Sequence, residues 1–220
     1  MADIFTEVDE EVRKDKFLEL WKKYGIFAVI AAILIVGGTA GTVGWREYKA
    51  RQAQEQGAVF LSILDQIAAG KYDEADKALA AFLPDASSGY RGPALMRVAQ
   101  IRLAQGKRTE ALDTLKALAA DENADKPFRD MANYYIAMLD MDTGDSAALR
   151  ARLDGLNGET SPWRHIAREM LAVLAIRDGD KATARDLLKK LSEDATAPAP
   201  VKARAAELLD SLGPAAGSGN

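Results

Sequence analysis

A short segment built around one glycine occurs four times along the chain. Its first two copies read Ala-Gly-Lys-Tyr-Asp-Glu-Ala at 69–75 and Gln-Gly-Lys-Arg-Thr-Glu-Ala at 105–111. The four glycines, which stand 36, 38 and 35 residues apart, are Gly70, Gly106, Gly144 and Gly179. A period of this length indicates a solenoid, in which one small helical unit is copied and stacked along the chain.

The residues around these glycines share one apolar pattern. Apolar side chains stand seven and three residues before each glycine, and five, nine and twelve residues after it. In chain order these positions are Ile63, Ile67, Ala75, Leu79 and Phe82; Ala99, Leu103, Ala111, Leu115 and Leu118; Ala137, Met141, Leu149, Leu153 and Leu156; and Ala172, Ile176, Ala184, Leu188 and Leu191. The spacing predicts one helix before and one helix after each glycine, packed face to face. We expect each glycine to take the left-handed conformation that ends the first helix.

This register resembles the tetratricopeptide repeat, which has a period of about 34 residues and an alanine five positions past the loop glycine. The characteristic tryptophan near the start of each repeat is absent, and the terminal proline is displaced to Pro84, Pro127, Pro162 and Pro198. We therefore expect an all-α protein with a degenerate tetratricopeptide-like solenoid of about four helix pairs over residues 46–213. A capping helix from Pro198 to Leu212 is expected to cover the last pair, and residues 214–220 are expected to form a disordered tail.

A run of twenty residues without a charge, Gly25 to Gly44, precedes the repeats. As a helix it is about 30 Å long, which matches the hydrocarbon core of a bilayer. Tryptophan, tyrosine and basic residues flank the run on both sides, as they do at membrane interfaces. We predict a single transmembrane helix over 25–45. The alternatives are a buried core helix, for which the run is long, and a cleaved signal peptide, for which the preceding segment is too long and too acidic.

The orientation of this helix follows from the basic residues near its two ends. Five of them lie on the N-terminal side within 13–23, and three lie on the C-terminal side within 46–51. The positive-inside rule then favours a cytoplasmic segment over 1–24 and an exported repeat domain. In a Gram-negative host the protein would be in the inner membrane and the repeat domain in the periplasm.

Small residues recur at four-residue spacing within the predicted membrane helix. Gly37 and Gly41 form one such pair, and Ala40 and Gly44 form a parallel one. This spacing lets two helices approach closely, so the four residues are candidates for packing against a second copy or another membrane helix. Glycine is also common in membrane helices in general, and the oligomeric state, including a homo-oligomer, stays open.

The composition offers little chemistry for catalysis. The chain has no cysteine and a single histidine, His165, which excludes thiol nucleophiles, histidine-based triads and multi-histidine metal sites. The carboxylates Asp121, Glu122 and Asp125 cluster in a predicted loop, where solvation is the default and a weak calcium site is the alternative. The net charge of −4 disfavours nucleic acid as a ligand. We expect a protein that is not an enzyme and that needs no cofactor or metal.

Repeat scaffolds of this kind bind partners on a concave face that the first helix of each pair lines. The register places six residues near that face: Met96, Gln100, Met131, Tyr134, Met138 and Arg177. Methionine adapts to varied apolar partners, although the favoured interpretation of these methionines is that they fill a loosely packed core. Tyr134 and Arg177 belong to residue types that are enriched at interface hot spots. The six residues are our candidate partner-binding site.

The order of segments along the chain resembles one particular family. An acidic N-terminal tail leads to a basic and aromatic stretch, WKKYG at 21–25, and then to the apolar helix, the exit GWREY at 44–48 and the degenerate repeats. This order is similar to that of the YfgM-like family, which consists of ancillary subunits of the bacterial SecYEG translocon.

The resemblance implies an inner-membrane protein with a periplasmic repeat domain and no catalytic residues. It also implies partners, namely the SecYEG translocon and periplasmic chaperones or exported polypeptides. The alternative function is that of a membrane-tethered assembly scaffold in envelope biogenesis or cell division, unrelated to secretion.

Overall fold

The computed structural model describes residues 3–213, and every regular element in that range is a helix. In chain order the elements are α1 (Asp3–Ala68), α2 (Tyr72–Phe82), the short 3-10 helix η1 (Leu83–Asp85), α3 (Ser88–Ala104), α4 (Arg108–Ala120), α5 (Lys126–Asp140), α6 (Ser146–Leu156), α7 (Arg164–Arg177), α8 (Lys181–Glu193) and α9 (Ala199–Ser211). The all-α prediction is confirmed for this range. The chain divides into two compact units, Met1–Gly57 and Ala58–Asn220.

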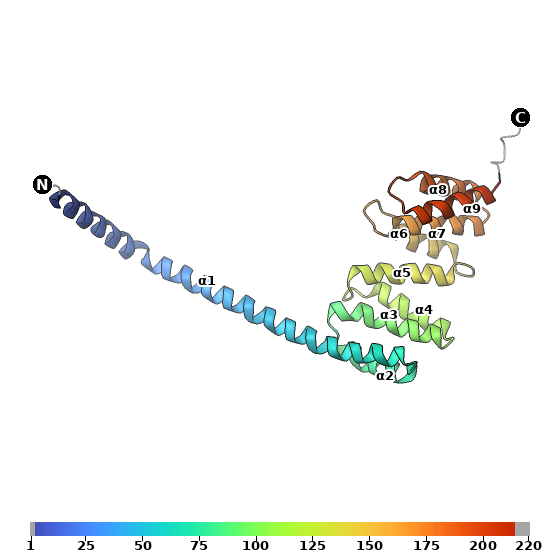
Figure 1. Ribbon diagram of the computed structural model, residues 1–220, viewed down its shortest axis with the longest axis horizontal. Coiled ribbons are helices and arrows are strands. Elements are labelled where there is room, and N and C mark those ends of the chain that lie inside the picture. The colour runs from blue at the N-terminus through green and yellow to red at the C-terminus, as the bar shows by residue number, and fades with distance from the viewer. Residues whose placement is uncertain (1–2, 214–220) are drawn as a thin grey trace, which may run out of the picture. The chain divides into compact units, whose positions relative to one another are not determined.

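The second unit is built from helix pairs that follow one another in chain order (Figure 1). The last turns of α1 pair with α2, and the further pairs are α3 with α4, α5 with α6, and α7 with α8. The final helix, α9, packs on α8 and α7. The predicted four pairs and C-terminal capping helix are therefore present, and α9 lies within the predicted range.

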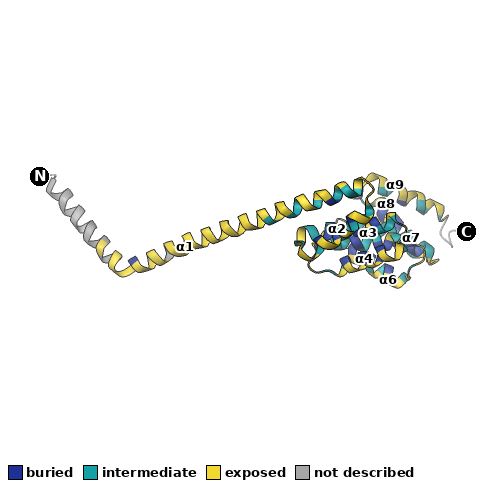
Figure 2. Cartoon of the chain, turned by 90° about the horizontal axis from the view of Figure 1, so that it is seen from below, coloured by how far each residue is buried: buried dark blue, intermediate teal, exposed yellow. Residues whose placement is uncertain are grey.

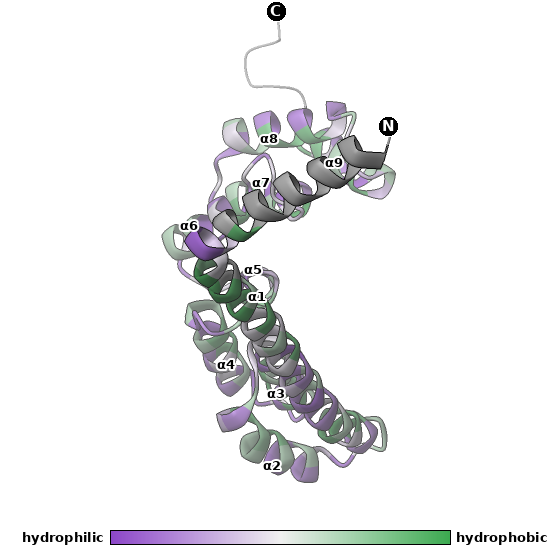
Figure 3. Ribbon diagram, turned by 90° about the vertical axis from the view of Figure 1, so that its left-hand side faces the viewer, coloured by the Kyte–Doolittle hydropathy of each residue, from purple (hydrophilic) through white to green (hydrophobic). Residues whose placement is uncertain are grey.

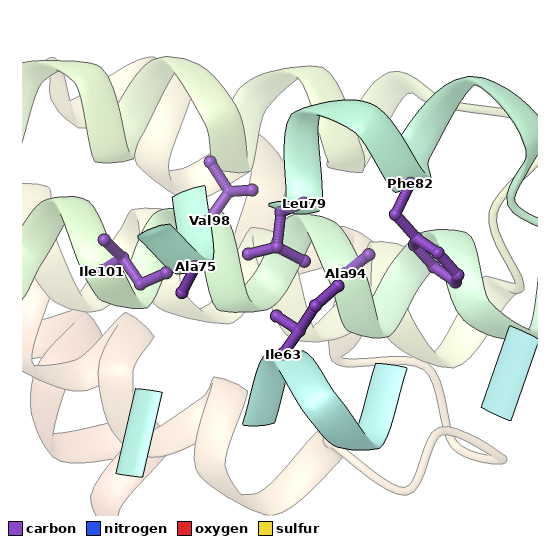
Figure 4. Packing of buried hydrophobic residues seen from close by; sticks show 7 residues of the cluster. All are labelled: Ile63, Ala75, Leu79, Phe82, Ala94, Val98 and Ile101. Atoms are coloured by element: carbon purple, nitrogen blue, oxygen red, sulfur yellow. The ribbon is translucent and has the colours of Figure 1, made fainter. Parts of the chain in front are cut away.

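The buried residues are those that the glycine register marks. The side chains that stand seven residues before each glycine, and five, nine and twelve residues after it, are all buried. Figure 4 shows the first cluster of buried residues, which includes Ile63 of α1, Leu79 and Phe82 of α2, and Val98 of α3. The positions three before each glycine are half-buried.

Each second helix packs between two first helices. The cluster around Leu115 and Leu118 of α4, for example, joins Ala99 of α3 to Ile136 of α5. Because this arrangement repeats along the unit, four clusters of buried residues follow one another from α1 to α9. Burying one such leucine contributes about 1.5–3 kcal/mol, so stacked pairs stabilise one another although a single pair has little core of its own.

Three of the four predicted glycine turns have the expected geometry. Gly70, Gly106 and Gly179 have φ values of 72°, 75° and 80°. In each turn the glycine N–H and the next residue's N–H donate to carbonyls of the preceding helix, as from Lys107 N to Arg102 O at 2.8 Å. This bonding pattern ends an α-helix with a left-handed glycine.

The prediction of a left-handed turn is wrong at Gly144, whose φ is not positive. Its N–H donates to Asp140 O at 2.7 Å, and a Cβ on Gly144 would lie 2.7 Å from the same oxygen. Glycine is therefore required here by close approach to α5, and not by the sign of φ.

The described residues of the first unit all lie within α1, which runs for 66 residues without a break. In the described part of the chain, one stretch is long and apolar enough to span a membrane by length and composition, and it lies in α1 between Trp21 and Ala68. None of its most apolar window is buried, and Figures 2 and 3 show this stretch as exposed and hydrophobic. Leu34 is 69% exposed and Ile33 is 65% exposed, so the alternative of a buried core helix does not hold.

No helix end coincides with either end of the predicted membrane segment, because α1 continues through both residue 25 and residue 45.

The hydroxyls of the two threonines within the apolar stretch bind backbone carbonyls of their own helix. Thr39 Oγ1 donates to Ile35 O at 2.7 Å, and Thr42 Oγ1 donates to Thr39 O at 2.9 Å. The predicted disordered tail, residues 214–220, lies outside the described residues.

Candidate functional site

A cavity of about 440 Å³ opens between α1, α3 and α5, which are the first helices of three successive pairs. Its apolar lining consists mainly of Phe60, Met96, Leu103, Phe128, Met131 and Tyr135. The volume lies within the range of roughly 300–1,000 Å³ that is usual for ligand pockets. Three of the six predicted partner-binding residues, Met96, Gln100 and Met131, line it.

The position of Phe128 in this cavity depends on a glycine of the facing helix. A Cβ built on Gly92 would lie 2.6 Å from both Cβ and Cγ of Phe128. Only glycine permits this approach of α3 and α5. The next residue, Pro93, also lines the cavity, and its ring replaces the N–H that would continue the helical bonding of α3.

Two polar side chains of the cavity, Arg97 and Gln100, lie on the same helix. Arg97 Nη1 donates a hydrogen bond to Gln100 Oε1 at 2.6 Å. Within the described part of the chain, Arg97 has no ion-pair partner. Arg97 is half-buried and Gln100 is exposed, so both side chains reach solvent at the edge of the apolar lining.

The predicted residues Tyr134 and Met138 lie outside this lining. The Tyr134 ring stacks on Trp163, with centroids 5.5 Å apart, and meets Tyr135 edge-on at 5.3 Å. Met138 is 43% exposed. Both residues belong to α5, as Met131 and Tyr135 do, but neither of them lines the cavity.

The structure places the predicted residue Arg177 in a different environment. Its guanidinium donates to Met141 O at 2.7 Å and to Gly144 O at 3.0 Å, and it also binds Ser146 Oγ and Asp178. These bonds tie α7 to the turn between α5 and α6. The donors of Arg177 are thus used within the chain and not at the cavity.

Another polar contact joins α7 to the last helix. Arg204 of α9 donates to both carboxylate oxygens of Glu169 at 2.6 and 2.7 Å, and this contact raises the pKa of Arg204. Glu169 stands ten residues before Gly179 and is the counterpart of Met96, which stands ten before Gly106. Among the first helices, those near α1 thus present apolar side chains at this offset, whereas α7, next to α9, presents a carboxylate that pairs with Arg204 of α9.

A second cavity, of about 410 Å³, lies beside the start of α5 and the loop before α7. Pro127, Pro162 and Trp163 line it, together with Lys126 and Asp130, whose charged groups pair at 2.6 Å. Its lining shares no residue with the first cavity, and none of the predicted residues lies there.

Sequence reasoning missed several residues of the first cavity. Phe60 stands ten residues before Gly70, the same offset as Met96 and Tyr134, so the register itself could have identified it. Phe128 and Tyr135 stand 16 and nine residues before Gly144, and none of the six predicted partner-binding residues stands at either of these offsets. Only the helix packing shows that they meet Met131 and Met96.

The single histidine lies in a polar cluster between α7 and the loop after α8. His165 Nδ1 is 3.6 Å from Asp194 Oδ2, which also lies 3.5 Å from Arg168. Burial, followed by the charge of Arg164, lowers the pKa of His165 below its ordinary value. The neighbouring arginines and Asp194 give this cluster the character of a structural contact.

The predicted loop carboxylates are dispersed. Asp121 forms a part-buried ion pair with Arg91. Burial alone would raise the pKa of Asp121, but the hydrogen bonds from Arg91 and Asn123 lower it. Among the described residues, no group of three or more histidine or carboxylate side chains is arranged to hold a metal ion.

The small residues predicted to pack in the membrane lie on α1. A Cβ built on Gly37, Gly41 or Gly44 meets no atom within 4 Å, and Ala40 is exposed. Their role in packing against a second helix stays a prediction.

Comparison with known proteins gives one positive finding. A family model for a tetratricopeptide repeat-like domain matches residues 19–186. The match includes the apolar stretch of α1 and extends into α8. No curated protein matches the chain.

Proposed function

Because the chain belongs to the tetratricopeptide repeat-like domain family, we propose that it is a membrane-anchored scaffold that binds other proteins on the face of its first helices. Repeat domains of this kind bind proteins through extended surfaces and are typically not catalytic. The observation that carries the proposal is the apolar cavity between α1, α3 and α5, with Met96 and Met131 in its wall. Methionine side chains adapt to different apolar partners.

The membrane anchor is supported by the exposure of the apolar stretch in α1. Large apolar side chains such as Ile26, Phe27 and Leu34 are more than 60% exposed. A stretch of this length is costly to expose to water but fits the hydrocarbon core of a bilayer. The threonine hydroxyls at 39 and 42 bind helix carbonyls, which meets the requirement that polar groups in lipid find partners within the protein.

We further propose an inner-membrane location with a cytoplasmic N-terminus and a periplasmic repeat domain. In this setting the protein acts as an ancillary subunit of the Sec translocon and binds periplasmic chaperones or emerging polypeptides. The support is the resemblance in segment order and the bias of basic residues towards the N-terminal side of the apolar run. Anchoring near a channel raises the effective concentration of a partner, so modest affinity suffices.

The topology is tested by cysteine labelling, because the chain has no cysteine of its own. The variant Ser218→Cys is treated with a membrane-impermeant maleimide in spheroplasts. Labelling of intact spheroplasts is the expected result. Labelling only after lysis would place the repeat domain in the cytoplasm and overturn the periplasmic role.

The binding face is tested by photo-crosslinking in cells. A photoreactive amino acid replaces Met131 in the cavity or, as the control, the exposed Lys116 on α4. We expect adducts with translocon subunits or periplasmic chaperones at position 131, detected with specific antibodies, and no such adducts at position 116. Adducts with envelope-assembly or division proteins instead would favour the alternative scaffold role.

A further inference from the structure

Resting on the proposed function, we propose which kind of segment the cavity between α1, α3 and α5 binds. The occupant is a stretch of partner polypeptide that carries bulky apolar side chains next to a carboxylate. The proposal combines the apolar wall of the cavity with the hydrogen-bonding character of Arg97 and Gln100 at its edge.

The wall accounts for the apolar part of the occupant. Phe60, Phe128 and Tyr135 contribute aromatic rings, and Met96 and Met131 contribute flexible thioethers. Side chains of this kind exclude water and pack well against leucine or phenylalanine. Burial of such an anchor in a preformed cavity supplies most of the affinity of a peptide for a groove.

The edge accounts for the carboxylate. The Gln100 amide oxygen accepts one hydrogen bond from Arg97 Nη1, at 2.6 Å. Beyond this bond the edge offers mainly N–H groups, since an arginine has five donors and no acceptor and a glutamine amide has two donors against one remaining lone pair on its oxygen. A cationic edge rich in donors next to an apolar wall favours an acceptor on the partner, and a carboxylate forms the strongest such bonds with arginine.

The repeat register indicates that the charge of Arg97 is specific to this pair. Arg97 stands nine residues before Gly106, and the residues nine before the other three turn glycines are Leu61, Tyr135 and Met170. Three pairs therefore have an apolar residue where the pair that forms the centre of the cavity has a cation.

Two arginines elsewhere in the repeat domain are engaged within the chain. The guanidinium of Arg177 binds the turn before α6, and Arg204 of α9 neutralises Glu169. Arg97 makes no ion pair with any described carboxylate, although its side chain is half-buried. Its charge therefore remains available to a partner, and charge complementarity selects an acidic segment over a basic one.

The test measures binding of short fluorescein-labelled peptides to the full chain in phospholipid nanodiscs by fluorescence anisotropy. The peptides share a glycine–serine frame with leucine anchors and carry glutamate, glutamine or lysine at one adjacent position. We expect the glutamate peptide to bind about threefold to tenfold more tightly than the glutamine peptide, as a partly exposed charged hydrogen bond supplies. Added salt should reduce this preference.

Substitutions separate the contribution of Arg97 at the edge of the cavity from that of the apolar wall. Arg97→Gln should abolish the preference for glutamate, and Arg97→Glu should transfer it to the lysine peptide, a gain that a misfolded protein cannot show. Met131→Ala should weaken the binding of all three peptides. The control Lys116→Gln, which removes one exposed positive charge from α4, should change the affinity of none of them.

Two results would overturn the inference and leave the proposed function standing. One is equal binding of the glutamate and glutamine peptides with retained dependence on Met131. The other is a dimer in sedimentation experiments that dissociates with Arg97→Glu, which would make a second copy the occupant. Failure of every peptide to bind also overturns it, and the cross-linking at position 131 then decides separately whether the face binds proteins.

Discussion

Two glycines of α3 should respond in opposite ways to the same substitution. A Cβ on Gly92 would lie 2.6 Å from Cβ and Cγ of Phe128, whereas a Cβ on Gly89 meets no atom within 4 Å. Gly92→Ala should therefore destabilise the repeat domain, and Gly89→Ala should stabilise it. Both residues lie in the same helix, so the comparison isolates the contact between α3 and α5.

The expected magnitudes follow from the atoms involved. Overpacking in a well-packed interior costs about 1–3 kcal/mol, and alanine gains up to about 1 kcal/mol over glycine in a helix. The clashing atoms of Phe128 lie next to its backbone and cannot swing away, so α5 itself must move. We expect Gly92→Ala to destabilise by about 1–2 kcal/mol and Gly89→Ala to stabilise by about 0.4–1 kcal/mol.

The assay is urea unfolding of the full chain followed by far-UV circular dichroism. The two variants are compared by their midpoints, because a repeat array need not unfold in two states. A lower midpoint for Gly92→Ala and a raised one for Gly89→Ala are expected. If both variants shifted the midpoint upwards, the close approach of α3 and α5 would be refuted.

Three further predictions concern other parts of the repeat domain. Arg177→Met should lower the free energy of unfolding in urea by about 1–3 kcal/mol, because it leaves carbonyls of the α5–α6 turn without a donor. Leu153→Ala, at a fully buried position, should cost about 2–5 kcal/mol, whereas Leu61→Ala, at a residue that is 62% exposed, should change stability by less than about 0.5 kcal/mol. The pKa of His165 lies below its ordinary value of 6.5, so the unfolded chain binds more protons, and stability should fall as the pH drops from 6.5 towards the folded-state pKa. His165→Gln should remove this dependence; an unchanged pH profile of thermal unfolding would assign it to other groups.

The helix pairs could be predicted because their signal is local. Leu79, Leu115 and Leu153 each stand nine residues after a turn glycine, and all three are buried. A helix places such residues on one face whatever its neighbours are. The period then implies stacking, since one pair alone cannot bury its apolar face.

The turn at Gly144 could not be predicted, because its geometry depends on distant residues. The sequence around Gly144 resembles that of the other turns, yet its carbonyls are bound by Arg177, 33 residues further along the chain. A guanidinium replaces the bonds that a left-handed glycine forms elsewhere. Only the packing of α7 against the α5–α6 turn reveals this exchange.

The candidate site was predictable in part for the same reason. Met96 and Met131 were projected from the register and line the cavity. Phe128 reaches it because Gly92, on another helix, leaves room. A cavity arises where side chains of several helices fail to fill a space, and no single-helix pattern contains that information.

The dependence of Phe128 on Gly92 links stability to binding in a way that can be measured. Since Phe128 lines the cavity between α1, α3 and α5, the displacement forced by Gly92→Ala must also change the cavity wall. The variant should therefore bind leucine-containing peptides more weakly under conditions in which it is still folded. Gly89→Ala, which leaves the wall unchanged, should bind them as the wild type does. If Gly92→Ala lost stability but kept full peptide affinity, the peptides would bind elsewhere on the first helices, and the cavity would be only a packing defect of the solenoid.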